Sequence, residues 1–230
     1  MNNVLFEWKM IIRNKYLSQT LILMVFATVF LYFLMLSNPI IKDYFVFRIL
    51  FLVGLFSIPG SYYGVSSLGA MASFIEKLIT SPMPLSRILL SKYYLYSLYS
   101  TLVLLLALPL NMGTNRLEII ASYLFATGFM LFVFLRSALF GNSPVNIKGS
   151  SFLQWQGFSI ETLIPAMVCG VVLGFIAATN WLAGETLTLV VMSVVGAGFI
   201  LMHKYWIKSI CQTVRKTKHY RLECYRNNGE

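Results

Sequence analysis

The sequence predicts an all-α polytopic membrane protein with six transmembrane helices, an N-terminal interfacial helix and both termini in the cytoplasm. Three observations predict this fold class. The chain has 230 residues, of which 58% are hydrophobic and only 11% are charged, whereas soluble domains carry about 25% charged residues. Six stretches contain no Lys, Arg, Asp or Glu, and each approaches the length of about 20 residues that a helix needs to cross a bilayer. The basic residues are concentrated in alternate segments between these stretches.

The six uncharged stretches define the expected spans, which are residues 17–37, 49–74, 93–112, 119–135, 162–183 and 186–202. A very short turn around Gly184 joins the last two. The segments between spans are too short to fold alone, because chains below about 40 residues seldom form a stable core. The predicted transmembrane domain therefore covers residues 17–207 and includes a second cytoplasmic loop at 75–92 and a fourth loop at 136–161. A basic cytoplasmic tail follows at 208–230.

The distribution of Lys and Arg predicts the orientation of the chain. Of 18 basic residues, only Lys42, Arg48 and Arg116 fall on one side, and the other 15 lie at the two termini and in the second and fourth loops. Because cytoplasmic loops are enriched in Lys and Arg, both termini should face the cytoplasm. The net charge of +10 would then face anionic lipid headgroups. Nucleic-acid binding is the rival interpretation, and it is disfavoured because the charge follows the membrane edges rather than gathering on a domain.

The N-terminal segment 1–16 is amphipathic. In a helix, its apolar residues Val4, Leu5, Trp8, Ile11 and Ile12 share one face. We expect this segment to lie in the cytoplasmic interface of the membrane. The alternative is that it extends the first span.

The second span contains polar, Gly and Pro residues that are unusual at this depth. These residues are Ser57, Pro59, Gly60, Ser61, Tyr62, Tyr63, Gly64, Ser66 and Ser67. A proline kinks a helix, and a GxxxG pair lets another helix approach closely. Gly170 and Gly174 form a second such pair in the fifth span. The second and fifth helices are therefore expected to line a pathway or a subunit interface, and tight helix packing with satisfied hydroxyls is the alternative.

The sequence contains none of the common catalytic motifs. It has no H-E-x-x-H zinc motif, no phosphate-binding loop and no G-x-S-x-G elbow. No carboxylate falls inside a predicted span. His203, Cys211, His219 and Cys224 fit no standard zinc spacing. The chain is therefore predicted to be no enzyme and to hold no cofactor or metal of its own.

The second loop carries the most specific motif. Glu76 is followed by Ser81-Pro82-Met83-Pro84 and then by the segment from Arg87 to Tyr93, which reads RILLSKY. The prolines should end one helix, and Ser86 can cap the next. Motif and topology together resemble the permease subunit of a type 2 ATP-binding-cassette exporter. The fourth loop is similar to a subgroup of that family from Bacteroidetes-type bacteria.

The resemblance implies a function and a set of partners. The permease would lie in the bacterial cytoplasmic (inner) membrane, pair with itself or a close paralogue, and bind separate ATPase subunits that hold ATP and Mg. It would move a lipid, a drug-like molecule, a peptide or a polysaccharide outward. The ATPase-docking residues would be Glu76, Ser81, Pro82, Met83, Pro84, Leu85, Ser86 and Arg87. The alternatives are a membrane scaffold or assembly protein without transport and, less favoured, a membrane-embedded lipid-modifying enzyme.

Overall fold

The computed structural model describes residues 15–61, 85–109, 115–137 and 160–216. Every regular element in these ranges is a helix, which confirms the all-α fold class. The helices are α2 (Lys15–Ser37), α3 (Pro39–Asp43), α4 (Phe45–Pro59), α6 (Leu85–Ala107), α7 (Arg116–Phe125), the π-helix η3 (Ala126–Met130), α8 (Leu131–Ser137), α9 (Ile160–Leu201) and α10 (His203–Lys216).

Three of the described helices are long and apolar enough to cross a membrane. They are Leu85–Ala107, Arg116–Ser137 and Gly170–Leu201, and Ile22–Leu34 and Phe45–Ile58 are shorter apolar helices. Large apolar side chains point outward along α2, α6 and α9, and such extensive apolar surfaces are not stable in water. The fold is therefore compatible with a membrane protein, and the six-span arrangement stays a prediction.

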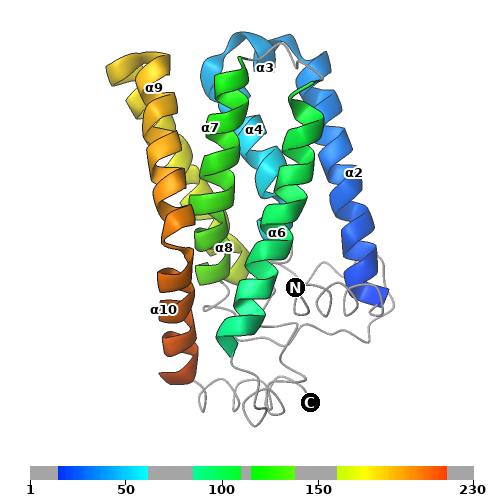
Figure 1. Cartoon of the computed structure of the whole chain (residues 1–230). Helices are drawn as coiled ribbons and strands as arrows, with labels where there is room; N and C mark the ends of the chain where they lie inside the picture. The colour runs from blue at the N-terminus through cyan, green and yellow to red at the C-terminus, as the bar shows by residue number, and fades with distance from the viewer. Residues whose placement is uncertain (1–14, 62–84, 110–114, 138–159, 217–230) are drawn as a thin grey trace.

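The long helices stand side by side as a bundle, and the short helix α3 crosses one end of it (Figure 1). Two residues explain the position of α3. The Asn38 side chain caps α3 by accepting a hydrogen bond of 3.0 Å from the backbone N of Ile40. Tyr44 is extended, with φ −97° and ψ 115°, and separates α3 from α4. These breaks let the chain turn back at this end of the bundle.

Helix α6 is bonded to three other helices through three consecutive residues. The hydroxyl of Tyr99 lies 2.7 Å from Oγ1 of Thr28 in α2. Ser100 donates a 2.7 Å hydrogen bond to the carbonyl of Phe56 in α4. Thr101 lies 2.8 Å from the hydroxyl of Tyr123 in α7. Successive residues of a helix point about 100° apart, so each of the three reaches a different neighbour.

Helices α7, η3 and α8 form one continuous rod that packs against the second half of α9. The closest approach joins two glycines. A Cβ placed on Gly128 would overlap the backbone of Gly196, and a Cβ on Gly196 would lie 2.6 Å from the backbone N of Phe125. The two backbones are therefore in direct contact, as in other apolar helix pairs with small interfacial residues. The π-helix η3 lies at this contact.

The chain turns within α9 at Gly184. This residue has φ 78° and ψ 175°, whereas its neighbours are helical. A positive φ favours glycine, and no atom lies within 4 Å of a Cβ built there. The backbone angle, and not a lack of space, therefore explains the glycine. The two halves of α9 run in opposite directions (Figure 1), which agrees with the turn that the sequence predicts around Gly184.

Helix α10 continues beyond the end of α9 and packs against α6 and α8. Its buried face consists of Trp206, Ile207, Ile210, Cys211 and Val214. Residues 208–216, the first part of the predicted tail, therefore belong to a packed amphipathic helix.

Cys211 is expected to resist alkylation in the folded protein. Burial raises the pKa of its thiol to about 11, and thiols react as thiolates. A rise of about two units lowers the thiolate fraction at neutral pH by about 100-fold. We would measure maleimide labelling in a Cys169→Ser/Cys224→Ser background, with an exposed Ser209→Cys/Cys211→Ser variant as the matched control. Equal labelling rates for the two thiols before unfolding would contradict the buried position of Cys211.

Candidate functional site

The predicted ATPase-docking loop is described only at its end. Glu76 and the segment 81–84 lie outside the described residues. Leu85, Ser86 and Arg87 form the first turn of α6, where Leu85 and Ser86 are half-buried and Arg87 is exposed. This turn, the C-terminal end of α8 and α10 share one end of the bundle (Figure 1), which we call the basic end.

Two described residues of the predicted pathway, Ser57 and Gly60, are buried between helices. Ser57 is buried and donates to the carbonyl of Gly54 at 3.2 Å. Ser61 donates to the carbonyl of Ile58 at 2.9 Å. Gly60 is buried against α8, because a Cβ there would lie 2.7 Å from Leu131 Cδ2 and 2.8 Å from Phe134 Cδ2. In this conformation Ser57 and Gly60 match the packing alternative, whereas Ser61 is exposed with its hydroxyl hydrogen-bonded, and the role of all three in a pathway stays a prediction.

The remaining pathway candidates fall in two groups. Pro59 lies at the end of α4, and the residues Tyr62, Tyr63, Gly64, Ser66 and Ser67 lie outside the described part of the chain. Gly170 and Gly174 are exposed on α9, with no atom within 4 Å of a Cβ built on either. No described helix therefore packs on this GxxxG pair, and its face is accessible to lipid or to a second subunit.

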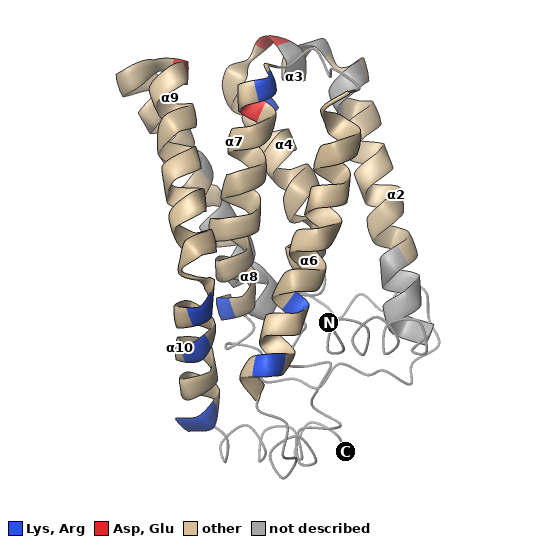
Figure 2. Cartoon of the chain, viewed as in Figure 1, with Lys and Arg blue, Asp and Glu red and all other residues tan. Residues whose placement is uncertain are grey.

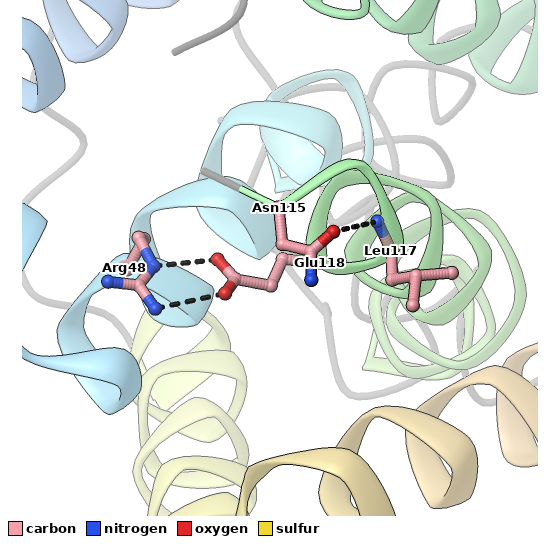
Figure 3. Close-up of polar contacts among 4 residues, drawn as sticks. All are labelled: Arg48, Asn115, Leu117 and Glu118. Atoms are coloured by element: carbon pink, nitrogen blue, oxygen red, sulfur yellow. Dashed lines mark hydrogen bonds and ion pairs between the residues drawn. The ribbon is translucent and has the colours of Figure 1, made fainter. Parts of the chain in front are cut away.

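A buried ion pair lies at the opposite end of the bundle, and sequence reasoning did not single it out. Arg48 of α4 binds Glu118 of α7 through two hydrogen bonds, Nε to Oε2 at 2.6 Å and Nη2 to Oε1 at 2.9 Å (Figure 3). The side chains are only 14% and 6% exposed. Such two-point contacts between guanidinium and carboxylate are both directional and strong. The ion pair therefore links α4 to α7 at this end of the bundle.

The local sequence positions both partners. Asn115 caps α7 by accepting a hydrogen bond of 3.4 Å from the backbone N of Leu117 (Figure 3). Glu118 then lies in the first turn of α7, where the helix dipole favours a negative charge. The guanidinium carbon of Arg48 also lies 5.9 Å from the ring centroid of Phe45. One sequence signal was present, because Arg48 and Glu118 each directly precede an uncharged stretch and have opposite signs.

A chain of aromatic contacts leads from the centre of the bundle to the basic end. Neighbouring ring centroids lie 5.0–5.5 Å apart along the order Phe125, Phe129, Phe199, Phe132, Trp206, Tyr93 and His203. His203 stacks on Tyr93 with an interplanar angle of 13°. Its Nδ1 lies 2.7 Å from the carbonyl of Ile200, and its Nε2 lies 3.2 Å from the hydroxyl of Tyr94. These rings fix α10 to α6, α8 and α9.

The described residues do not bring metal ligands together. Within them, no group of at least three His, Cys, Asp or Glu side chains is placed to hold a metal ion. His219 and Cys224, two of the four residues whose spacing fits no standard zinc pattern, lie outside the described residues.

Comparison with known proteins identifies the family. A family model described as "Family of unknown function (DUF5687)" matches residues 3–228. The chain belongs to this family. No curated protein and no solved structure matches the chain. The match spans nearly the whole chain, and the description of the family gives no activity.

Proposed function

We propose that this chain is the permease subunit of an ATP-driven exporter in a bacterial cytoplasmic membrane, coupled to a separate ATPase. The distribution of charge supports an orientation across the membrane. Figure 2 shows Lys and Arg on α10 and at the adjacent ends of α6 and α8. The described acidic side chains, those of Asp43, Glu118 and Glu185, lie near the other end. With the basic end in the cytoplasm, this arrangement follows the positive-inside rule.

The observation that carries the proposal is the position of the first turn of α6. This turn follows Ser81-Pro82-Met83-Pro84 directly in the sequence. It lies at the basic end and exposes Arg87 to a cytoplasmic partner. Helix α6 is also bonded to α2, α4 and α7 through Tyr99, Ser100 and Thr101. A force applied by an ATPase at the start of α6 would therefore reach three other helices.

The transport pathway would lie between two permease subunits. The second and fifth helices remain the candidates for lining it, and the exposed face of α9 at Gly170 and Gly174 is accessible to a second copy. ATP-driven closure of the ATPases would rock the bundle and move a lipid, a drug-like molecule, a peptide or a polysaccharide outward. ATP and Mg would be bound by the ATPase, since this chain lacks a phosphate-binding loop.

Replacing Met83-Pro84-Leu85 with Gly-Ser-Gly is expected to abolish association with the ATPase and to leave membrane insertion intact. The change removes Pro84, one of the two prolines of the turn that the sequence predicts, and the first apolar side chain of α6. We would purify the tagged protein in mild detergent and identify the accompanying proteins by mass spectrometry. The matched control is Leu98→Ala/Leu102→Ala, which changes the exposed face of the same helix far from the turn.

Two results would contradict parts of this proposal. Survival of ATPase association in the loop variant would show that the docking assignment is wrong. A wild-type preparation without any ATPase, also after gentle cross-linking in nanodiscs, would favour the scaffold alternative over the exporter.

A further inference from the structure

We propose that the exposed face of α10 is a second docking surface, which binds an acidic face of the ATPase subunit. This inference rests on the proposed function and extends it, because the loop motif alone concerns only the segment before α6. The surface consists of Lys204, Lys208, Arg215 and Lys216, all of which are exposed.

Three of the four cations of α10 form a stripe, and Lys216 lies about 80–120° from them around the helix axis. At about 100° per residue, Lys204, Lys208 and Arg215 fall within about 40° of one another around the helix axis. The sequence of α10, HKYWIKSICQTVRK, contains no Asp or Glu. The acidic side chains that the structure describes, Asp43, Glu118 and Glu185, lie near the opposite end of the bundle (Figure 2). The positive potential of this face is therefore not offset by acids of α10 itself.

The buried face of α10, which adjoins the stripe, holds the helix in a fixed orientation. The indole Nε1 of Trp206 donates a 3.0 Å hydrogen bond to the carbonyl of Phe199, and the indole ring packs edge-on against Tyr93 at 5.5 Å between centroids. Ile207 and Ile210 are each 1% exposed. The helix backbone that carries the cations is therefore already ordered, and binding would cost conformational entropy only in the Lys and Arg side chains.

The length of α10 favours a protein partner over lipid headgroups. The apolar stretch of the sixth span ends just before His203 and Lys204, which places these residues at the membrane boundary. Figure 1 shows α10 continuing from α9 in nearly the same direction. Arg215 then lies about 16 Å further from the membrane than Lys204, whereas the headgroup layer is only about 5–8 Å thick on each side. Lys208 therefore lies toward the outer limit of the headgroups, and Arg215 and Lys216 lie past it.

The stripe also lies next to the docking turn of α6. Helices α6 and α10 are in contact, and the two run together at the basic end (Figure 1). Arg87 is exposed on α6 in this region. One partner with an acidic face can therefore contact the turn of α6 and the stripe of α10 at the same time, which would strengthen binding more than either contact alone.

The test uses the ATPase that co-purifies with the wild-type chain as the probe. Reversal of the distal cations, Lys208→Glu/Arg215→Glu/Lys216→Glu, is expected to lower ATPase recovery at least tenfold at about 0.1 M salt, and Gln at the same positions should have a smaller effect of the same sign. Wild-type recovery should fall between about 0.05 M and about 0.5 M salt, because exposed charges are screened. The matched control is Ser209→Ala/Gln212→Ala, which changes exposed uncharged residues of the same helix.

The possible outcomes separate the two proposals. Unchanged recovery in the reversal variant, together with loss in the Met83-Pro84-Leu85 variant, would overturn the α10 surface and leave the exporter proposal intact. Absence of an ATPase from the wild type would overturn both. An effect of the reversal in nanodiscs with anionic lipid, but not in nanodiscs of neutral lipid alone, would show that α10 binds headgroups and would overturn the inference. Slow maleimide labelling of Cys211 in every variant checks that α10 remains folded.

Discussion

Replacing Gly196 with alanine is expected to destabilise the protein by about 2 kcal/mol. The new Cβ would lie 2.6 Å from the backbone N of Phe125 and would overlap the carbonyl group of Leu124. Backbone atoms cannot rotate away as a flexible side chain can, so α7 and the second half of α9 would have to separate. For a chain of this size, the change corresponds to a decrease of about 4–8 °C in the apparent unfolding temperature. We would measure it in detergent by fluorescence-detected thermal unfolding.

The matched control is Gly198→Ala, on the same helix. No atom lies within 4 Å of a Cβ built on Gly198. Alanine is a better helix former than glycine by about 1 kcal/mol, so this variant should be neutral or slightly more stable. Gly128→Ala, which changes the other side of the contact, should destabilise the protein as Gly196→Ala does. Equal stability of the Gly196 and Gly198 variants would show that the two backbones are not in contact.

The sequence predicted elements whose signals are local. The uncharged stretches are helical in the parts that the structure describes. They could be predicted because a long run without charged residues is visible in the sequence itself, whatever it packs against. The turn at Gly184 was predictable because it follows a short interruption between two such stretches. Helix α6 starts at Leu85, before the uncharged stretch at 93–112. Charged residues mark the limit of an uncharged stretch, but a helix can continue through them.

The first part of the C-terminal tail had a readable signal as well. The apolar residues Trp206, Ile207, Ile210, Cys211 and Val214 have the spacing of one helix face. The basic residues between them give the segment a high charge, which is equally typical of an unpacked cytoplasmic tail.

Contacts between distant segments were beyond sequence reasoning. The close contact between Gly128 and Gly196 depends on how the two helices are shifted and rotated relative to each other. A single sequence gives neither quantity. The same holds for Arg48 and Glu118, whose opposite signs are visible but whose pairing depends on α4 and α7 being neighbours. The hydrogen bonds of the Tyr99, Ser100 and Thr101 hydroxyls could likewise not be predicted without the positions of the three partner helices.

Removing the carboxylate of Glu118 is expected to destabilise the protein more than Gly196→Ala does. In a Glu118→Ala variant the guanidinium of Arg48 would lose both of its hydrogen bonds to Glu118. Loss of one partner of a buried pair destabilises proteins by about 3–5 kcal/mol, because the remaining buried charge loses its hydrogen-bonded counter-ion. The double variant Arg48→Met/Glu118→Leu removes both charges and should lie within about 1 kcal/mol of the wild type. Unfolding by denaturant in detergent would measure all three proteins.

The matched control for this pair is Glu185→Ala, which removes an exposed acid that also acts electrostatically on Arg48. Exposed charges contribute little, so its effect should stay within about 0.5 kcal/mol. If the double variant is as unstable as Glu118→Ala, the packing of the two side chains, and not the charge left behind, determines the loss. If Glu118→Ala is as stable as Glu185→Ala, the pair does not hold α4 to α7. A large loss in the single variant that the double variant restores is the result expected from a buried, directional ion pair between these two helices.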